Sequence, residues 1–159
     1  MTPEDHFRDG LSALGAGRPA EAVDHFQHAI SSEKQMGAVR PQMRYVSYYG
    51  LSMALSKRSL HAAVDLCERA ADRDDFDAIL MLNLGRVYVL TGRRIKALAT
   101  FERGLQLDPS NRRIRTEVSR LDRRRAPAWP SLGRDHAVNR SLGRLRASLL
   151  GPRRRNASG

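Results

Sequence analysis

The 159-residue chain carries 28 lysines and arginines against 17 aspartates and glutamates, which gives a formal net charge of +11. Its hydrophobic content is 41%, but only 6% of the residues are aromatic, which favours a helical array over a β-sandwich. No apolar run approaches the roughly 20 residues that a membrane-spanning helix needs, and the acidic start lacks the basic and apolar regions of a secretory signal. The single cysteine excludes an internal disulfide framework. These features predict a cytoplasmic protein of one domain with a short appendage.

The charge is unevenly distributed along the chain. Residues 1–111 contain fourteen basic and fourteen acidic side chains, which cancel. Residues 112–159 contain fourteen arginines and three acids, so the whole excess of eleven positive charges lies there. The charge therefore distinguishes the end of the chain from the residues that precede it.

The first helix pair is predicted from capping signals and spacing. Thr2 can cap a helix in which Pro3 takes the first position and two acids follow in the first turn. Apolar side chains then recur at helical spacing, and a return helix is expected from about Pro19 towards Ser32.

Residues 32–40 are predicted to lengthen the two helices that flank them. Gly37 and Pro41 bracket a turn, and Pro41 can open the next helix about one turn early. A disordered loop rich in serine, lysine and glycine is the alternative for this stretch.

Residues 78–111 show the clearest spacing in the chain. Small residues allow two short helices to approach closely, and aromatic residues can fill the space between them. Gly92 suits the turn because it has no Cβ, and Asp108-Pro109 ends the second helix because proline cannot continue it. The spaced positions are Gly85, Tyr88, Gly92, Ala97, Phe101, Gly104 and Pro109.

This spacing resembles one unit of the tetratricopeptide repeat (TPR) family, a helix–turn–helix of about 34 residues. A single unit cannot bury its own apolar face, so further copies are expected. Two lie upstream, with Ala22 and Ala63 in the place of Ala97. The first copy matches the motif at Gly10, Gly17, Phe26 and Ala29. In the middle copy Cys67 and Ala70 replace Phe101 and Gly104, and Leu51 and Arg58 stand where the small residue and the turn glycine are expected.

A capping helix and an arm are predicted after the third copy. Ser110 can cap a helix with an apolar stripe at Ile114, Val118 and Leu121, suited to covering the open end of a repeat array. We therefore predict an all-α fold, which the resemblance makes a right-handed superhelix of three TPR units. Residues 1–125 form its domain in this prediction.

Residues 126–159 are predicted to form an Arg-rich arm with a Pro/Trp linker, an amphipathic helix over residues 136–150 and a disordered end. Three functions are open for it: a solvated tail, binding of nucleic acid or an anionic membrane through arginine, or docking. Docking is preferred, because a purely electrostatic tail needs neither the tryptophan nor the amphipathic helix. The residues expected to dock are Trp129, Leu132, Val138, Arg140, Leu142, Arg144, Leu145 and Arg146.

The sequence gives little support to catalysis. His25 and His28 are the one pair of histidines that could share a metal, and nothing completes four ligands around them. Cys67 occupies the buried aromatic position of its repeat, so packing is its expected role. No phosphate-binding loop is present. We predict no catalytic residue, no metal site and no cofactor.

A binding groove is implied by the TPR resemblance, in which the first helix of each repeat lines the concave face. Some family members bind acidic peptides through a carboxylate clamp, and Asn83 and Arg86 are the only residues here that match it. An aromatic and aliphatic groove stands in its place, suited to an apolar segment or helix. The alternative is that Phe7, Leu11 and Tyr45 belong to the core. The groove positions are Phe7, Arg8, Leu11 and Leu14; Tyr45, Tyr48, Tyr49, Ser52 and Leu55; and Ile79, Leu82, Asn83, Arg86 and Val89.

The resulting prediction is a non-enzymatic, bacterial-type adaptor or chaperone that binds another protein. One alternative is a nucleic-acid-associated protein that uses its basic tail. Another is a chaperone of the type III secretion class, which resembles the chain in length and repeat number but is acidic.

Overall fold

The structure of the protein is a computed structural model that describes residues 1–123. The chain divides into two units, Met1–Ser119 and Arg120–Gly159. The first unit is described below, together with the few residues by which its last helix enters the second. The predicted arm, including its helix over residues 136–150, lies outside the described residues.

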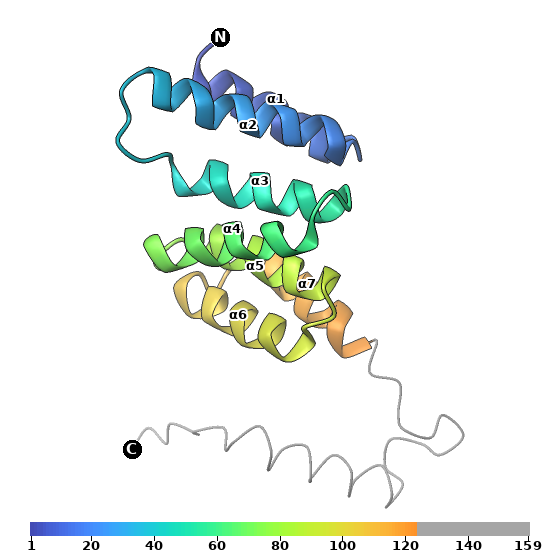
Figure 1. The fold of residues 1–159 in the computed structure, drawn as a ribbon. Helices are drawn as coiled ribbons and strands as arrows, with labels where there is room; N and C mark the ends of the chain where they lie inside the picture. Colours follow the sequence, from blue (N-terminus) through green and yellow to red (C-terminus); the bar gives the residue numbers. More distant parts are fainter. Residues whose placement is uncertain (124–159) are drawn as a thin grey trace, which may run out of the picture. The chain divides into compact units, whose positions relative to one another are not determined.

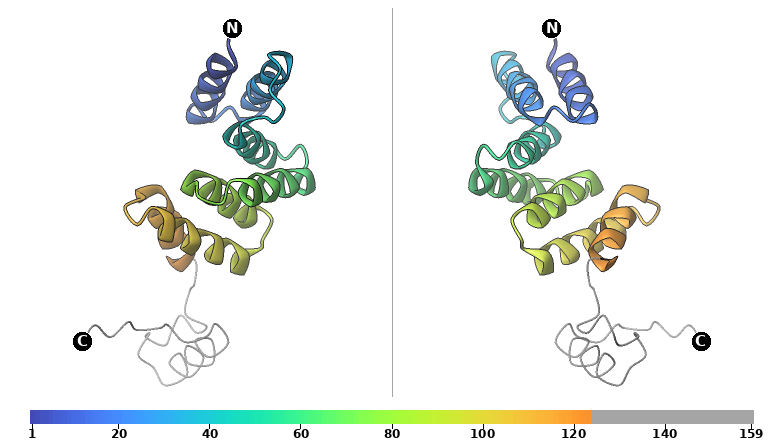
Figure 2. Two further views of the ribbon diagram at one scale, coloured as in Figure 1. Left: turned by 90° about the vertical axis from the view of Figure 1, so that its left-hand side faces the viewer. Right: turned by 90° about the vertical axis from the view of Figure 1, so that its right-hand side faces the viewer.

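The part of the chain that the structure describes is all α-helical, as predicted. Successive helices pair in TPR-like helix–turn–helix units, α1 with α2, α3 with α4 and α5 with α6, and the pairs follow one another along the first unit (Figure 1, Figure 2). In this region no helix is long and apolar enough to cross a bilayer. The helices are α1 (Pro3–Gly15), α2 (Pro19–Gln35), α3 (Met43–Leu55), α4 (Leu60–Arg73), α5 (Ala78–Leu90), α6 (Arg94–Leu107) and α7 (Arg112–Arg123).

Helix α1 begins with a capping box. The Thr2 hydroxyl accepts a hydrogen bond from the Asp5 backbone N–H at 3.2 Å, and the Asp5 carboxylate accepts one from the Thr2 backbone N–H at 2.8 Å. Two backbone donors that the helix itself leaves unpaired are thereby satisfied. The prediction from Thr2 and Pro3 is confirmed.

Each repeat brings its two helices together at a glycine. A Cβ added to Gly10 would lie 2.5 Å from Cε1 of Phe26, and one added to Gly85 would lie 2.3 Å from the same atom of Phe101. Both rings are fully buried. The close approach that the sequence predicts for the first and third repeats is therefore confirmed.

The second repeat differs from the prediction by one residue. Its small residue is Gly50, where an added Cβ would lie 2.8 Å from Cys67 Sγ, and not Leu51. Its turn residue is Lys57, at φ 57°, in the left-handed conformation that Gly17 and Gly92 adopt in the other turns. The turn between α3 and α4 is thus one residue longer, and this shifts every position of α3 relative to an alignment anchored on Ala63.

The connection between the first two repeats lengthens only one helix. Helix α2 has 17 residues, against 14 each in α4 and α6, whereas α3 has the same 13 residues as α1 and α5. Helix α3 begins at Met43, so Pro41 does not open it. The Gln42 backbone N–H instead donates to a carboxylate oxygen of Glu33 at 2.7 Å, which ties the connection back to α2.

Helix α7 forms where a capping helix is predicted, but it begins later. The side chain of Asn111 caps it by accepting from the Ile114 backbone N–H at 3.2 Å, whereas the Ser110 hydroxyl donates to Asp108. Ile114 is fully buried and packs over Gly104 of α6, whose added Cβ would lie 2.7 Å from Ile114 Cδ1. The stripe on α7 therefore covers the end of the third repeat.

Candidate functional site

The predicted groove residues lie on α1, α3 and α5, the first helices of the three repeats. These helices are adjacent: the ring of Phe7 on α1 lies 4.7 Å from that of Tyr45 and 5.5 Å from that of Tyr48 on α3, and α3 packs against α5. We call the exposed side of these three helices the first-helix face.

Several of the predicted residues are buried within the fold. Tyr45 donates its hydroxyl hydrogen to Glu4 of α1 at 2.8 Å, and the Ser52 hydroxyl donates to the Tyr48 backbone carbonyl at 2.8 Å. Phe7 packs against the rings of Phe26 and Tyr45. The buried members of the predicted set are Phe7, Tyr45, Ser52, Leu82 and Asn83. The one-residue shift in the second repeat explains why Tyr45 and Ser52 are buried, because it turns these two side chains away from the side on which they were expected.

The two residues that match a carboxylate clamp both have partners within the protein. Asn83 donates from its side-chain amide to the hydroxyl of Ser47 at 3.1 Å, and both residues are fully buried. Arg86 lies 3.0 Å from a carboxylate oxygen of Glu117 on α7. Asn83 thus joins the second repeat to the third, and Arg86 joins the third to the capping helix. Asn83 is therefore hidden from any peptide, whereas Arg86 stays exposed although it is paired with Glu117.

The remaining groove residues give the first-helix face an apolar character. Leu11 and Arg8 are exposed on α1, Tyr48 is half-buried on α3, and Ile79 is half-buried on α5. Tyr49 is also half-buried, but the one-residue shift gives it the place that Leu84 has in the third repeat, and Leu84 does not belong to this face. Tyr48 and Tyr49 pack against the core cluster while keeping part of their surface in solvent. Such side chains offer an apolar body with a polar tip to a bound segment.

A shallow hollow of about 350 Å³ opens at the α5 end of this face. Its floor is aliphatic, from Ile79 and Leu82, and its rim comes from the start of α7. The rim residues are Asn111, Arg112 and Arg113. An apolar floor beside two arginines suits an apolar side chain next to an acidic group.

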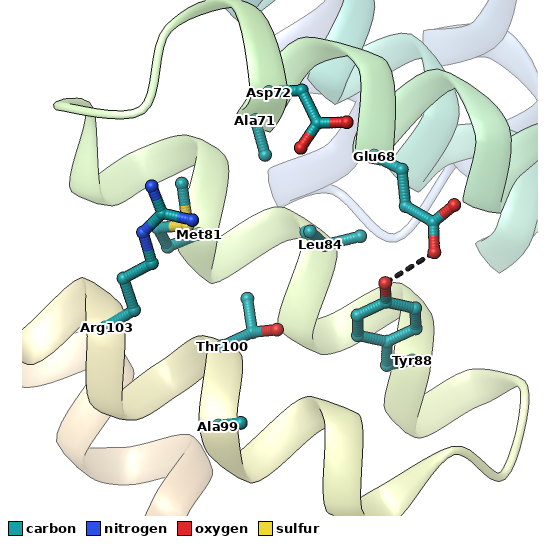
Figure 3. Close-up of a pocket in the computed structure, with 9 residues that line it drawn as sticks. All are labelled: Glu68, Ala71, Asp72, Met81, Leu84, Tyr88, Ala99, Thr100 and Arg103. Carbon is teal, nitrogen blue, oxygen red and sulfur yellow. Dashed lines mark hydrogen bonds between the residues drawn. The ribbon is translucent and has the colours of Figure 1, made fainter.

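A second hollow, of about 410 Å³, lies between α4, α5 and α6 (Figure 3). The sequence does not reveal it, because its shape depends on the spacing between the second helices of two repeats. Glu68 and Asp72 project over it from α4, and Arg103, which lies 3.1 Å from Asp75, reaches it from α6. The other lining residues are Ala71, Met81, Leu84, Tyr88, Ala99 and Thr100.

Glu68 and Tyr88 close one side of this hollow. The Tyr88 hydroxyl donates to Glu68 at 2.5 Å, and Lys96 Nζ lies 3.9 Å from the same carboxylate and 5.5 Å from the centre of the Tyr88 ring. Burial, aided by the hydrogen bond to Glu68, raises the pKa of Tyr88 above its usual value. The phenol therefore stays protonated and serves as a structural donor.

The described residues offer little chemistry for catalysis or metal binding. Cys67 is fully buried, and desolvation raises the pKa of its thiol to about 12. A neutral, buried thiol packs rather than reacts. His28 faces His6, with ring centres 5.3 Å apart, and His25 lies beside Glu21. Within residues 1–123, no group of three or more metal-ligating side chains is present.

The predicted docking residues of the arm cannot be placed against this geometry. Trp129, Leu132, Val138 and Leu142, with Leu145 and the arginines at 140, 144 and 146, all lie outside the described residues. Their role stays a prediction.

Comparison with known proteins matches one of the three repeats to a family model and finds a distant relative. Residues 78–111 match the family model "Tetratricopeptide repeat". The chain is similar to "Photosystem I assembly protein Ycf3" of Prochlorococcus marinus (strain MIT 9313), with 28% identity over 125 residues that make up 78% of this chain and 61% of that protein. The chain thus spans less than two thirds of that relative.

Two solved structures share the fold at low sequence identity. The "Arabidopsis OM64 TPR domain" superposes with a TM-score of 0.60 at 20% identity, over 77% of this chain and 96% of that one. The "First TPR of Spaghetti (RPAP3) bound to HSP90 peptide SRMEEVD" superposes with a TM-score of 0.59 at 14% identity, over 79% and 94%. The matched motif, the three helix pairs and these superpositions agree: residues 78–111 form a tetratricopeptide repeat, and residues 1–123 share the fold of such repeats.

Proposed function

We propose that the protein is a non-enzymatic adaptor or chaperone that holds a segment of another protein on its first-helix face. The tetratricopeptide repeat implies protein–protein interaction, and the similar domain of Spaghetti is bound to a peptide. The observation that carries the proposal is the apolar character of this face. The apolar side chains come from three adjacent helices: Leu11 from α1, Tyr48 from α3 and Ile79 from α5.

The chemistry of the face favours an apolar segment over the acidic peptide named for the Spaghetti structure. Asn83 is buried against Ser47, so the pair that would grip a terminal carboxylate is incomplete, and the exposed Arg86 already has Glu117 as a partner. Ile79 supplies an aliphatic floor, and the arginines at the start of α7 can hold an acidic group at one end. An amphipathic helix with an acidic end fits this arrangement.

A role in assembly is the finer proposal. The relative from Prochlorococcus is named as an assembly protein, and by analogy we propose that this chain holds a component that is not yet in its final complex. Partial exposure of Tyr48 supports this role, because tyrosine can cover an apolar surface temporarily and still remain solvated when the surface is released.

The second candidate is a nucleic-acid-associated protein. It is favoured by the fourteen arginines against three acids in residues 112–159, a balance that attracts phosphates. In that case the repeats would recruit other proteins, while the basic segment supplied most of the affinity.

Capture of partners by variants of single face residues distinguishes the partner-binding protein from the nucleic-acid-associated protein. The tagged intact chain is expressed in its native host, cross-linked and purified, and its captured proteins are compared with those of Leu11→Asp and Ile79→Asp. Ile79 is the second residue of α5, where an acidic side chain suits the helix start and should preserve the fold. Met36→Asp is the matched control, because Met36 is exposed but lies outside this face.

The expected result is about tenfold weaker capture of the same partner by Leu11→Asp and Ile79→Asp, since each loses burial of one aliphatic side chain. Met36→Asp should capture normally, and all three variants should keep the circular dichroism spectrum. Capture that survives both face variants but disappears in high salt or after nuclease treatment would favour the nucleic-acid candidate.

A further inference from the structure

Four large aliphatic side chains are exposed at the turns of the second and third repeats. Leu55 and Leu90 are the last residues of α3 and α5, with 40% and 44% of their surface exposed. Leu60 and Ile95 lie at the starts of α4 and α6, with 42% and 75% exposed. Exposed apolar side chains that gather in this way mark interaction sites more often than isolated ones do.

The two turns lie on the same edge of the molecule. Helices α3 and α5 run in the same direction and pack against each other, so their last residues end side by side (Figure 1). Both views of Figure 2 keep the α3–α4 turn and the α5–α6 turn one after the other along this edge. We call Leu55, Leu60, Leu90 and Ile95, with the cations between them, the turn edge.

The turn edge is basic as well as apolar. Residues 55–61 and 90–96 contain no acidic side chain. Arg58 lies 3.3 Å from Asp24, and Lys96 lies 3.9 Å from Glu68, but both contacts are exposed and only partly offset the positive charge. The basic residues of the two turns are Lys57, Arg58, Arg93, Arg94 and Lys96.

We propose that the turn edge is a contact surface for an anionic lipid bilayer, in which Leu90, Ile95 and their neighbours enter the headgroup region while the flanking cations contact lipid phosphates. Aliphatic side chains flanked by lysine and arginine are the combination by which peripheral proteins bind such surfaces. This function goes beyond the proposed binding of a partner. Leu55 is also one of the predicted groove positions, but Leu60, Leu90 and Ile95 are not, and none of the four residues lines the hollow beside α7.

Charge and shape favour lipid over the other polyanions. Nucleic acid would use the cations but would leave Leu90 and Ile95 in water, because phosphates offer no apolar surface. An acidic protein surface would have to be complementary to two projecting turns, whereas the lipid headgroup region deforms around them. The net charge of +11 also draws the whole chain toward an anionic bilayer and raises the local concentration of the turn edge there.

The test must separate the turn edge from the arginine-rich end of the chain, which can bind anionic vesicles by charge alone. An environment-sensitive thiol dye is therefore attached to the full-length variant Ile95→Cys. The native Cys67 is fully buried with a pKa of about 12, so the introduced thiol is the one that reacts. Val39→Cys is the matched control, because Val39 is 95% exposed in the α2–α3 connection, away from the turn edge.

Vesicles of phosphatidylglycerol and phosphatidylcholine should shift the dye emission to the blue at Ile95→Cys and not at Val39→Cys. Pure phosphatidylcholine should shift neither, since the cations find no net anionic surface. An unlabelled chain with Leu90→Gln and Ile95→Gln together should bind the mixed vesicles about tenfold more weakly or worse at about 0.5 M salt, where screened contacts contribute little. Val39→Gln should bind as the native chain does.

Three results would overturn the proposal. In the first, the labelled chain sediments with the mixed vesicles but its emission does not shift, which would mean that charge elsewhere holds it. In the second, Val39→Cys shifts as much as Ile95→Cys. In the third, a DNA oligonucleotide or an acidic peptide without lipid produces the same blue shift at Ile95→Cys, which would assign the turn edge to that polyanion.

Discussion

The close approach of α5 to α6 at Gly85 predicts that Gly85→Ala destabilises the third repeat. The added Cβ would lie 2.3, 2.6 and 2.8 Å from three carbons of the Phe101 ring, whereas carbon atoms in contact normally keep about 3.5–4.0 Å. The ring is fully buried and has no solvent to move into. The helices must therefore separate, or Phe101 must leave its preferred rotamer.

Two opposing effects set the size of the change. Overpacking of this kind costs about 1–3 kcal/mol, while replacing a helical glycine by alanine contributes up to about 1 kcal/mol in favour of the helix. The expected net loss is about 1–2 kcal/mol of unfolding free energy, measured by urea denaturation followed at the helical circular dichroism band. For a chain of about 150 residues each kcal/mol corresponds to about 2–4 °C in Tm.

Gly15→Ala is the matched control, because no side-chain or backbone atom lies within 4 Å of the Cβ that it would add. It should be neutral or stabilising by up to about 1 kcal/mol. The double variant Gly85→Ala with Phe101→Leu should lose less unfolding free energy than the sum of the losses in the two single variants, because the smaller side chain makes room for the methyl group. A Gly85→Ala protein as stable as the Gly15→Ala protein would refute the close packing of α5 on α6.

Two further predictions concern the second repeat. Lys57→Gly should stabilise the fold by about 1 kcal/mol in urea denaturation, because a lysine at φ 57° carries the strain of the left-handed conformation and a glycine does not; an unchanged or lower stability would argue against this turn geometry. The pKa of Cys67 is raised to about 12 by burial, so the folded state keeps its proton above pH 9 while the unfolded state loses it. Stability should therefore fall as the pH rises from about 8 to 10, with a slope approaching 1.4 kcal/mol per pH unit, and Cys67→Ala should remove most of that slope; equal slopes would contradict the buried neutral thiol.

The sequence predicts the helix pairs well because their contacts depend on residue size at fixed spacing. Gly85 and Phe101 leave few alternatives for the packing of α5 on α6, and Thr2 with Asp5 marks the first helix start. These signals lie within one helix pair or one turn. They can be read without knowing how one repeat contacts the next.

The register of the second repeat could not be obtained in the same way. Aligning on Ala63 fixes α4, but a single extra residue in the preceding turn moves all of α3, and no glycine marks that turn. Lys57 adopts the conformation that glycine takes in the other repeats. Gly50 was the available signal, since it is the small residue that lies opposite Cys67, one position before Leu51.

The binding residues are harder to predict because exposure depends on the neighbouring repeat. Spacing assigns Asn83 to the first-helix face, but only the packing of α3 on α5 shows that Ser47 covers it. Spacing likewise does not show that Arg86, which stays exposed, pairs with Glu117 on the capping helix. Periodicity gives the side of a helix on which a residue lies, and it does not give the depth at which the next helix buries it.

The two proposed surfaces meet on a single helix and can still be tested separately. Helix α5 carries Ile79 at its second residue and Leu90 at its last, so the partner site lies at one end and the turn edge at the other. Ile79→Asp should therefore leave vesicle binding unchanged, and the combined Leu90→Gln and Ile95→Gln variant should leave partner capture unchanged. Loss of both functions in either variant would mean that α5 itself had been disturbed. Independent losses would mean that the protein can hold a partner while it lies on an anionic bilayer, with the first-helix face free of the lipid.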